Sequence, residues 1–216
     1  MKKGLSHLNV TLTLLLFIFI IFKDKFVYFA PHLQVSIALF IYPLTFLIPI
    51  LIFNKYKAKE AKKAIFYSAL AIFAFYLVAI IFCSVGSHLD SANISNSLRV
   101  IFTPNQLEIN NIIIYYPNLF VFGFLIIYIL TRLIMISIYD TLKYYSNNYI
   151  GFAMALFIAF IIDTMFVVPL YHFSAFFKSS YDMMEVIKFL TANFIVVIFT
   201  SAILSLIYPL IYKKKN

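Results

Sequence analysis

The sequence predicts an all-α, polytopic integral membrane protein with six transmembrane helices in one bundle. Three observations support this: 64% of the 216 residues are hydrophobic and only 12% are charged, six long apolar stretches fill most of the chain, and lysines cluster in alternate gaps between them. A helix needs ~20 apolar residues to cross a hydrocarbon core ~30 Å thick. Residues 1–216 should form a single domain, because no gap is long enough for a second one.

The six expected helices cover residues 5–22, 33–53, 64–86, 118–139, 150–171 and 187–212. The first follows Met1-Lys2-Lys3, the charge order of a signal peptide, but no small-residue cleavage site follows it and Lys23-Asp24-Lys25 closes the run. We therefore expect a transmembrane helix there. The second expected helix contains Pro43 and Pro49, which remove backbone donors and kink a helix. We expect this helix to be the broken or gating element.

The longest polar interval runs from Gly86 to Pro117. Its apolar patches, Leu98–Phe102 and Ile112–Ile114, are compatible with a segment lying on or re-entering the membrane surface. Pro104 interrupts any helix there. An ordinary loop is therefore the favoured interpretation.

The positive charges predict the topology, because cytoplasmic loops near span ends retain Lys and Arg. With the N-terminus inside, the inner segments hold eleven of these residues and the outer segments five. Both termini should be cytoplasmic, in the inner (plasma) membrane of the cell. The Lys55–Lys63 segment is expected to fix this topology and to bind anionic lipid. The net charge of +9 lies in short gaps beside helices, so nucleic acid is not an expected partner.

Two charged residues, Arg132 and Asp163, lie well inside expected spans. At 1.5 Å per residue, they sit ~10 Å and ~18 Å from the cytoplasmic ends of sequential, antiparallel helices. An extended arginine can bridge that difference, so a pair is predicted if the two faces meet. Two interpretations stay open: a buried pair that fixes helix packing, or part of a substrate or proton pathway.

Other polar side chains give weaker signals. The last expected helix carries one polar stripe, formed by Asn193, Thr200, Ser201, Ser205 and Tyr208. Interhelical packing is favoured over cavity lining for this stripe, and Thr45 and Thr131 share the same ambiguity. The 42 Phe and Tyr residues are expected mostly to face lipid and the interfaces, without forming an aromatic cage.

Catalytic and metal chemistry are not expected. Cys83 is the only cysteine, so neither an intrachain disulfide nor a cysteine-based metal site can form. The sequence has no H-E-x-x-H, no P-loop and no second intramembrane acid to pair with Asp163. We therefore predict no enzyme activity, no cofactor and no catalytic residue.

Three segments, in order, resemble the putative vitamin uptake family, which includes the queuosine precursor transporters. They are Tyr42–Ile48 with the following Asn54–Ile65, then Ile161–Phe166 with its Asp-Thr-x-x-Phe pattern, and finally Pro209–Tyr212. The resemblance covers nearly the whole chain and implies a six-helix transporter.

The chain also departs from that family. The family typically has an acidic residue where Ile50 stands, another near Asn54, and a glycine where Lys57 stands. Its fourth helix usually carries a Gln and then an Asp, at the positions of Arg132 and Met135. The resemblance therefore implies a divergent member, with changed substrate or lost activity.

The expected function is import of a small heterocyclic nutrient, resembling queuosine precursor (7-deazaguanine type) uptake. Asp163 would accept hydrogen bonds from ligand N–H groups, with Arg132 as its partner or anchor, and Thr45, Asn193 and Thr200 could line the cavity. The alternatives are a substrate-binding subunit of an ATPase-energised uptake complex and a non-transporting structural paralogue. The expected partners are the lipid bilayer and the small-molecule substrate, and a homo-oligomer is compatible with these helices.

Overall fold

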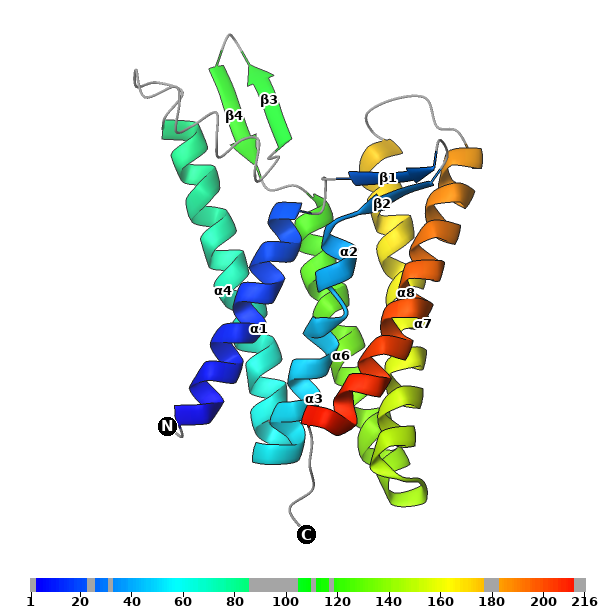
Figure 1. The fold of residues 1–216 in the computed structure, drawn as a ribbon. Helices are drawn as coiled ribbons and strands as arrows, with labels where there is room; N and C mark the ends of the chain where they lie inside the picture. Colours follow the sequence, from blue (N-terminus) through cyan, green and yellow to red (C-terminus); the bar gives the residue numbers. More distant parts are fainter. Residues whose placement is uncertain are drawn as a thin grey trace.

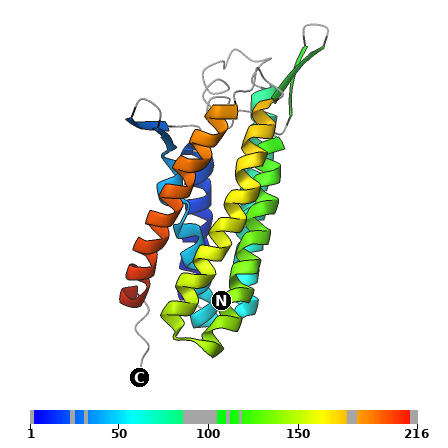
Figure 2. The ribbon, with the colours of Figure 1, turned by 90° about the vertical axis from the view of Figure 1, so that its right-hand side faces the viewer.

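The computed structural model describes residues 3–22, 26–30, 33–85, 105–109, 112–116, 119–176 and 183–211. Its helices are α1 (Lys3–Phe22), α2 (Ala38–Ile41), α3 (Leu44–Tyr56), α4 (Ala58–Val85), α6 (Leu119–Tyr145), α7 (Asn148–Phe176) and α8 (Met183–Ile211). The long helices lie side by side in one elongated body (Figures 1 and 2). The expected helical class is thus confirmed for the body of the molecule.

Four helices in the described part of the chain are long and apolar enough to cross a membrane. Their apolar segments are Gly4–Phe22, Ala58–Phe82, Val121–Tyr145 and Asn148–Phe166. Two further apolar helical segments, Leu44–Tyr56 and Phe194–Pro209, are shorter. These helices indicate a membrane protein.

The second expected helix differs from the prediction at its start. Leu33–Ser36 forms strand β2, paired antiparallel with β1 (Phe26–Ala30), so the continuous helix predicted over 33–53 is wrong there. The helix begins only at Ala38. Leu33–Ser36 alternates apolar and polar residues, which favours a strand, but these four residues run directly into the apolar stretch of the helix and were counted with it.

The predicted break in this segment is confirmed. Helix α2 ends at Ile41 and α3 begins at Leu44, because Pro43 has no N–H for an i→i−4 hydrogen bond. Pro43 keeps helical angles, with φ −57° and ψ −30°, so the chain continues in nearly the same direction. The Thr45 and Phe46 N–H groups donate to carbonyls three residues earlier, both at 3.0 Å.

A second hairpin occupies part of the interval that we expected to be an ordinary loop. Strands β3 (Asn105–Ile109) and β4 (Ile112–Tyr116) pair antiparallel, which corrects the loop prediction for these residues. The β-branched run at the start of β4 favours a strand, and two residues connect it to β3, a common hairpin length. The Leu98–Phe102 patch lies outside the described residues.

The two ends of the helical body differ. The start of α1, the α3–α4 and α6–α7 connections and the end of α8 lie at one end, and both hairpins lie at the other (Figure 1). The Lys55–Lys63 segment therefore sits at the same end as the two terminal helix ends. We call this the lysine end.

The corner between α3 and α4 has an unusual backbone. Lys57 has φ 79° and ψ 164°, and it is the only non-glycine residue with positive φ among the described residues. Its N–H donates to the Phe53 carbonyl at 2.9 Å, which closes the last turn of α3. A side chain is strained in this region, where glycine is normally found.

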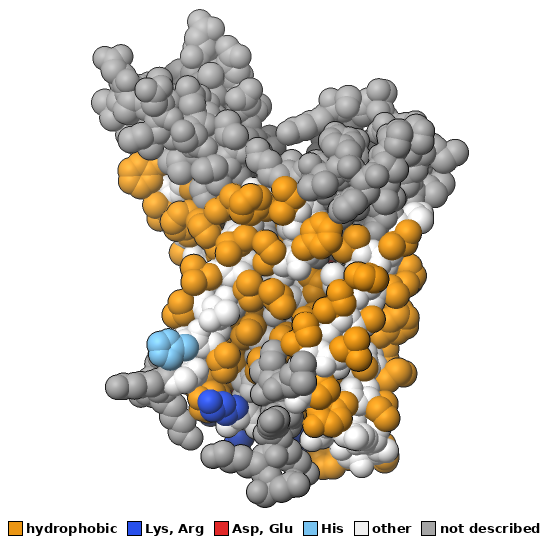
Figure 3. All heavy atoms as spheres, viewed as in Figure 1, with side chains coloured by type: hydrophobic (Ala, Val, Ile, Leu, Met, Phe, Trp, Pro, Cys, Tyr) orange, Lys and Arg blue, Asp and Glu red, His pale blue; other side chains and the backbone are white. Residues whose placement is uncertain are grey.

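The sides of the body are apolar as well as its core. Large exposed hydrophobic side chains, including Leu70 of α4, Phe199 of α8 and Leu206 of α8, project from the long helices. Figure 3 shows apolar side chains over the middle of the visible face and lysines near the lysine end. A soluble protein rarely exposes apolar patches of this extent, whereas a surface in contact with lipid requires them.

Candidate functional site

The buried centre of the helical body contains an ion pair between α6 and α7. Arg132 Nη1 lies 2.7 Å from Asp163 Oδ1, and the two side chains are 0% and 4% exposed. The pairing predicted from helix rise is therefore present. Each residue lies near the middle of its own helix, so the pair is far from both ends of the body.

The guanidinium of Arg132 also reaches the broken segment. Its Nη1 donates to Thr131 Oγ1 and its Nη2 donates to Thr45 Oγ1, both at 2.7 Å. The Thr45 hydroxyl in turn donates to the carbonyl of Tyr42, at 2.6 Å, across the break between α2 and α3. Arg132 thus ties α6 to α7 and to α3. Its Nε is buried and has no hydrogen-bond partner among the described residues.

One oxygen of Asp163 accepts hydrogen bonds from three donors, two on α6 and one in the broken segment. Besides Arg132, the Tyr42 hydroxyl and the Thr131 hydroxyl each lie 2.9 Å from Asp163 Oδ1. The Thr131 hydroxyl also lies 2.9 Å from the Ile127 carbonyl, so its single proton serves one acceptor at a time. Charge-assisted hydrogen bonds of this kind compensate a buried carboxylate for its lost hydration.

Three aromatic rings surround the guanidinium. The Arg132 Cζ lies 3.6 Å from the ring centre of Phe46 and 4.5 Å from those of Tyr42 and Tyr128. Such contacts stabilise a cation, the more so when it is desolvated. The expectation that the aromatic residues form no cage is therefore wrong at this point, although here the enclosed cation belongs to the protein.

A second polar cluster links α3, α6 and α8. Asn54 Nδ2 donates to the hydroxyls of Tyr208, at 2.6 Å, and Tyr139, at 3.0 Å, and these hydroxyls lie 2.9 Å apart. Tyr139 is seven residues after Arg132 on α6, so this cluster lies ~10 Å closer to the lysine end. The Tyr208 ring also stacks on Phe152 at 4.2 Å. We call it the Asn54 cluster.

The structure brings together some of the predicted site residues. Thr45, Arg132 and Asp163 form one network, in which Thr131 also takes part. Thr200 donates to the Val196 carbonyl within α8, at 2.7 Å. The side chain of Asn193 lies outside the described residues.

Sequence reasoning gave no role to Tyr42, although it precedes Pro43 directly. Beside the break that Pro43 makes, the Tyr42 carbonyl accepts both the backbone N–H and the hydroxyl of Thr45. Its place directly before Pro43 is the feature of the sequence that could have identified Tyr42.

In the helical stripe of α8, Ser201 and Tyr208 are buried, which agrees with the favoured packing interpretation for those two residues.

The network can donate and accept hydrogen bonds in an apolar surrounding. It offers a carboxylate acceptor, a guanidinium and hydroxyl groups, which together suit a small polar ligand with both N–H and carbonyl groups. Within the described ranges, no group of three or more His, Cys, Asp and Glu side chains could hold a metal ion.

No family model matches the chain, and no curated protein or solved structure matches it either. The fold and the network therefore define the class by themselves: a helical protein with apolar, membrane-length helices and an ion pair buried among them.

Proposed function

We propose that the chain crosses the inner (plasma) membrane six times, with both termini in the cytoplasm. The grouping of helix ends supports this, since the start of α1, the end of α8 and the Lys55–Lys63 segment lie at one end of the body. The split of eleven to five positive residues assigns that end to the cytoplasm. The two shorter apolar helical segments, in α3 and α8, complete the six crossings.

We further propose that the protein imports a small heterocyclic nutrient, of the 7-deazaguanine type that queuosine precursor transporters carry. The observation that carries this proposal is the Arg132–Asp163 pair, buried at mid-helix and joined to a broken helix. Ionisable groups inside a membrane are costly and usually mark a transport pathway. Transporters commonly place their sites beside interrupted helices.

The ligand would enter the network at Asp163. Two of the three donors to Asp163 Oδ1 come from α6, and the third, the Tyr42 hydroxyl, comes from the broken segment. A ligand N–H group can take the place of the Tyr42 hydroxyl when that segment moves. Arg132 then keeps the carboxylate in position, and Thr45 offers a hydroxyl to the ligand.

The backbone of Lys57 supports the family resemblance behind this proposal. Lys57 occupies the position where the family has a glycine, and its φ of 79° is the conformation that glycine adopts most easily. This corner therefore fits the geometry of the family even though the residue differs.

An uptake experiment tests the function. Cells unable to make queuosine would express the protein and receive low external 7-deazaguanine precursor, and modified tRNA would be measured. The wild-type protein should restore the modification. Asp163→Asn should abolish it when the variants are compared at matched amounts of protein in the membrane, whereas Asp140→Asn, an acid-to-amide change in an ion pair whose Asp140 side chain is 44% exposed, should not.

Purified protein in liposomes separates the alternatives. Transport by the chain alone supports the importer. Binding without transport would instead support a capture subunit of an ATPase-energised complex, and neither binding nor transport would favour a structural paralogue. Full tRNA modification with Asp163→Asn would refute the site.

A further inference from the structure

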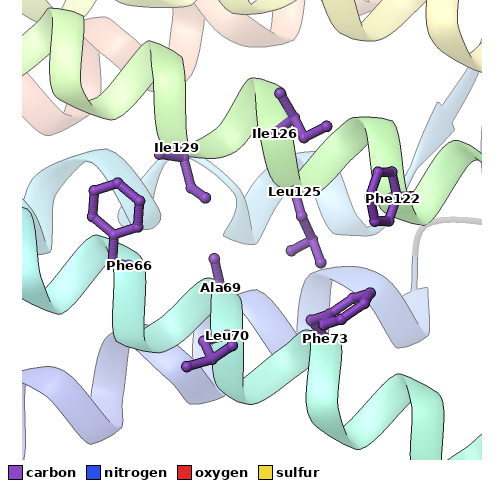
Figure 4. Close-up of a pocket in the computed structure, with 8 residues that line it drawn as sticks. All are labelled: Phe66, Ala69, Leu70, Phe73, Phe122, Leu125, Ile126 and Ile129. Carbon is purple, nitrogen blue, oxygen red and sulfur yellow. The ribbon is translucent and has the colours of Figure 1, made fainter.

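A groove runs along the outside of the body between α4 and α6. Its volume is ≈ 200 Å³, and its walls are Phe66, Ala69, Leu70 and Phe73 of α4 and four apolar side chains of α6 between Phe122 and Ile129. Figure 4 shows Leu125 and Ile129 of α6 pointing toward α4, and Phe66 and Ala69 of α4 pointing toward α6. Ala69 is 3% exposed and forms part of the floor, whereas Leu70 is 61% exposed at the rim.

The lysine end of this groove is positively charged. Lys59 and Lys62 precede the groove on α4, and with Phe66, Ala69 and Phe73 they follow alternating spacings of three and four residues. Residues at these spacings lie on one face of a helix. Both lysines are exposed, and neither forms an ion pair with a described residue, whereas Lys63 pairs with Glu60 at 3.3 Å. The acid at this end of α6, Asp140, pairs with Lys143 at 2.7 Å.

The dimensions match one lipid molecule of a single leaflet. Phe66 lies ~6 Å and Phe73 ~16 Å along the helix from Lys62. Half of the hydrocarbon core is ~15 Å thick. A headgroup at Lys59 and Lys62 therefore places an acyl chain in the groove down to the bilayer midplane. The Phe73 and Phe122 rings, 5.9 Å apart, lie at that far end.

We propose that this groove, with Lys59 and Lys62, is a binding site for an anionic phospholipid of the leaflet at the lysine end. The apolar walls contact one acyl chain, and the two lysines bind the phosphate-bearing headgroup. This leaflet is the anionic cytoplasmic one if the topology proposed above holds. The charges select the headgroup, because a zwitterionic lipid with the same chains fills the groove equally well but attracts the lysines less.

Native mass spectrometry of the full chain in detergent tests the site. Phosphatidylglycerol and phosphatidylcholine with identical palmitoyl and oleoyl chains are added as competing probes. Each lysine near an anionic headgroup is worth about a fivefold preference, so two should give phosphatidylglycerol roughly a 30-fold advantage. Changing both Lys59 and Lys62 to Gln should bring the preference close to one. The matched control changes Lys55 and Lys57, which precede α4, and should lower it no more than a few-fold.

The groove itself is tested with two matched pairs of variants. Ala69→Leu fills the floor and should reduce retention of both lipids several-fold, whereas Ala71→Leu, at an exposed position of the same helix, should not. Because Ala69 is buried and a larger residue there could impair folding, Phe66→Ala is measured in parallel with Phe82→Ala, both being exposed positions.

Two results would overturn the proposal. One is an equal loss of preference in the Lys55/Lys57 control, which would indicate general charge attraction. The other is unchanged retention in Ala69→Leu and Phe66→Ala relative to their controls. The measurement involves neither uptake nor orientation, so its failure would leave the proposed transport function standing.

Discussion

Separating Arg132 from Asp163 should destabilise the protein far more than separating an exposed ion pair of the same length. Arg132–Asp163 and Lys143–Asp140 both have N···O distances of 2.7 Å, but the first pair is buried and the second is partly exposed. If burial sets the energy, two double-mutant cycles should give different coupling energies. The cycles combine Arg132→Gln with Asp163→Asn, and Lys143→Gln with Asp140→Asn.

The contacts indicate the size of each effect. Arg132→Gln removes three hydrogen bonds of 2.7 Å and leaves a buried carboxylate, which costs ~3–5 kcal/mol in comparable sites. Tyr42 and Thr131 still donate to that carboxylate, so we expect the lower value, ~3 kcal/mol. Asp163→Asn leaves a buried guanidinium and should cost about the same. The neutral double variant should also cost ~3 kcal/mol, which gives a coupling energy of ~3 kcal/mol.

Unfolding by SDS in mixed micelles measures these values. The chain has no tryptophan, so helix content by circular dichroism is the readout. The exposed pair should show a coupling energy below ~0.5 kcal/mol. Additive effects at Arg132 and Asp163, within ~0.5 kcal/mol, would refute the reasoning, as would equal coupling in the two pairs.

Three further predictions concern the ends of the body. Lys57→Gly should raise the free energy of unfolding by ~1 kcal/mol, because relief of ~1–3 kcal/mol of backbone strain exceeds the added chain entropy; the same change at a helical lysine should lower it. Tyr208→Phe should lower it by ~1 kcal/mol through loss of a buried hydroxyl from the Asn54 cluster, and no change would show that this cluster does not hold α8. Cysteines introduced at Ser87 and Ser179 should label from outside the cell in a cysteine-free background, and one at Ala58 should not; the reverse pattern would overturn the topology.

The sequence predicted the helical body because lipid leaves few alternatives for long apolar segments. The axial positions of Arg132 and Asp163 also followed from it, since helix rise fixes depth along each helix. Their contact also requires that the two helix faces lie against each other, and in the structure they do.

The remaining features depend on contacts between distant parts of the chain. Leu33–Ser36 alternates apolar and polar residues over only four positions, too few to define a strand alone, and its pairing with β1 decides the outcome. Tyr42 and Asp163 are 121 residues apart, and Asn54 and Tyr208 are 154 apart. Periodicity places each residue on a face of its own helix, but it does not say which neighbour that face meets.

The two polar layers place different constraints on the helices that they share. In the charged layer, Tyr42 belongs to the segment that Pro43 separates from the main part of α3, so this donor can move without disrupting α3. In the Asn54 cluster, Asn54, Tyr139 and Tyr208 all lie inside continuous helices, and the Tyr208–Phe152 stack adds α7 to the connection.

For the proposed transporter, this difference favours opening of the Asp163 site toward the end that carries the hairpins, while the lysine end stays closed. Ile50 and Met135 are fully buried and apolar, so they place hydrocarbon rather than polar groups in the core at these positions of α3 and α6. A ligand released toward the cytoplasm would therefore require α3 and α6 to separate at the Asn54 cluster, in a second and distinct step.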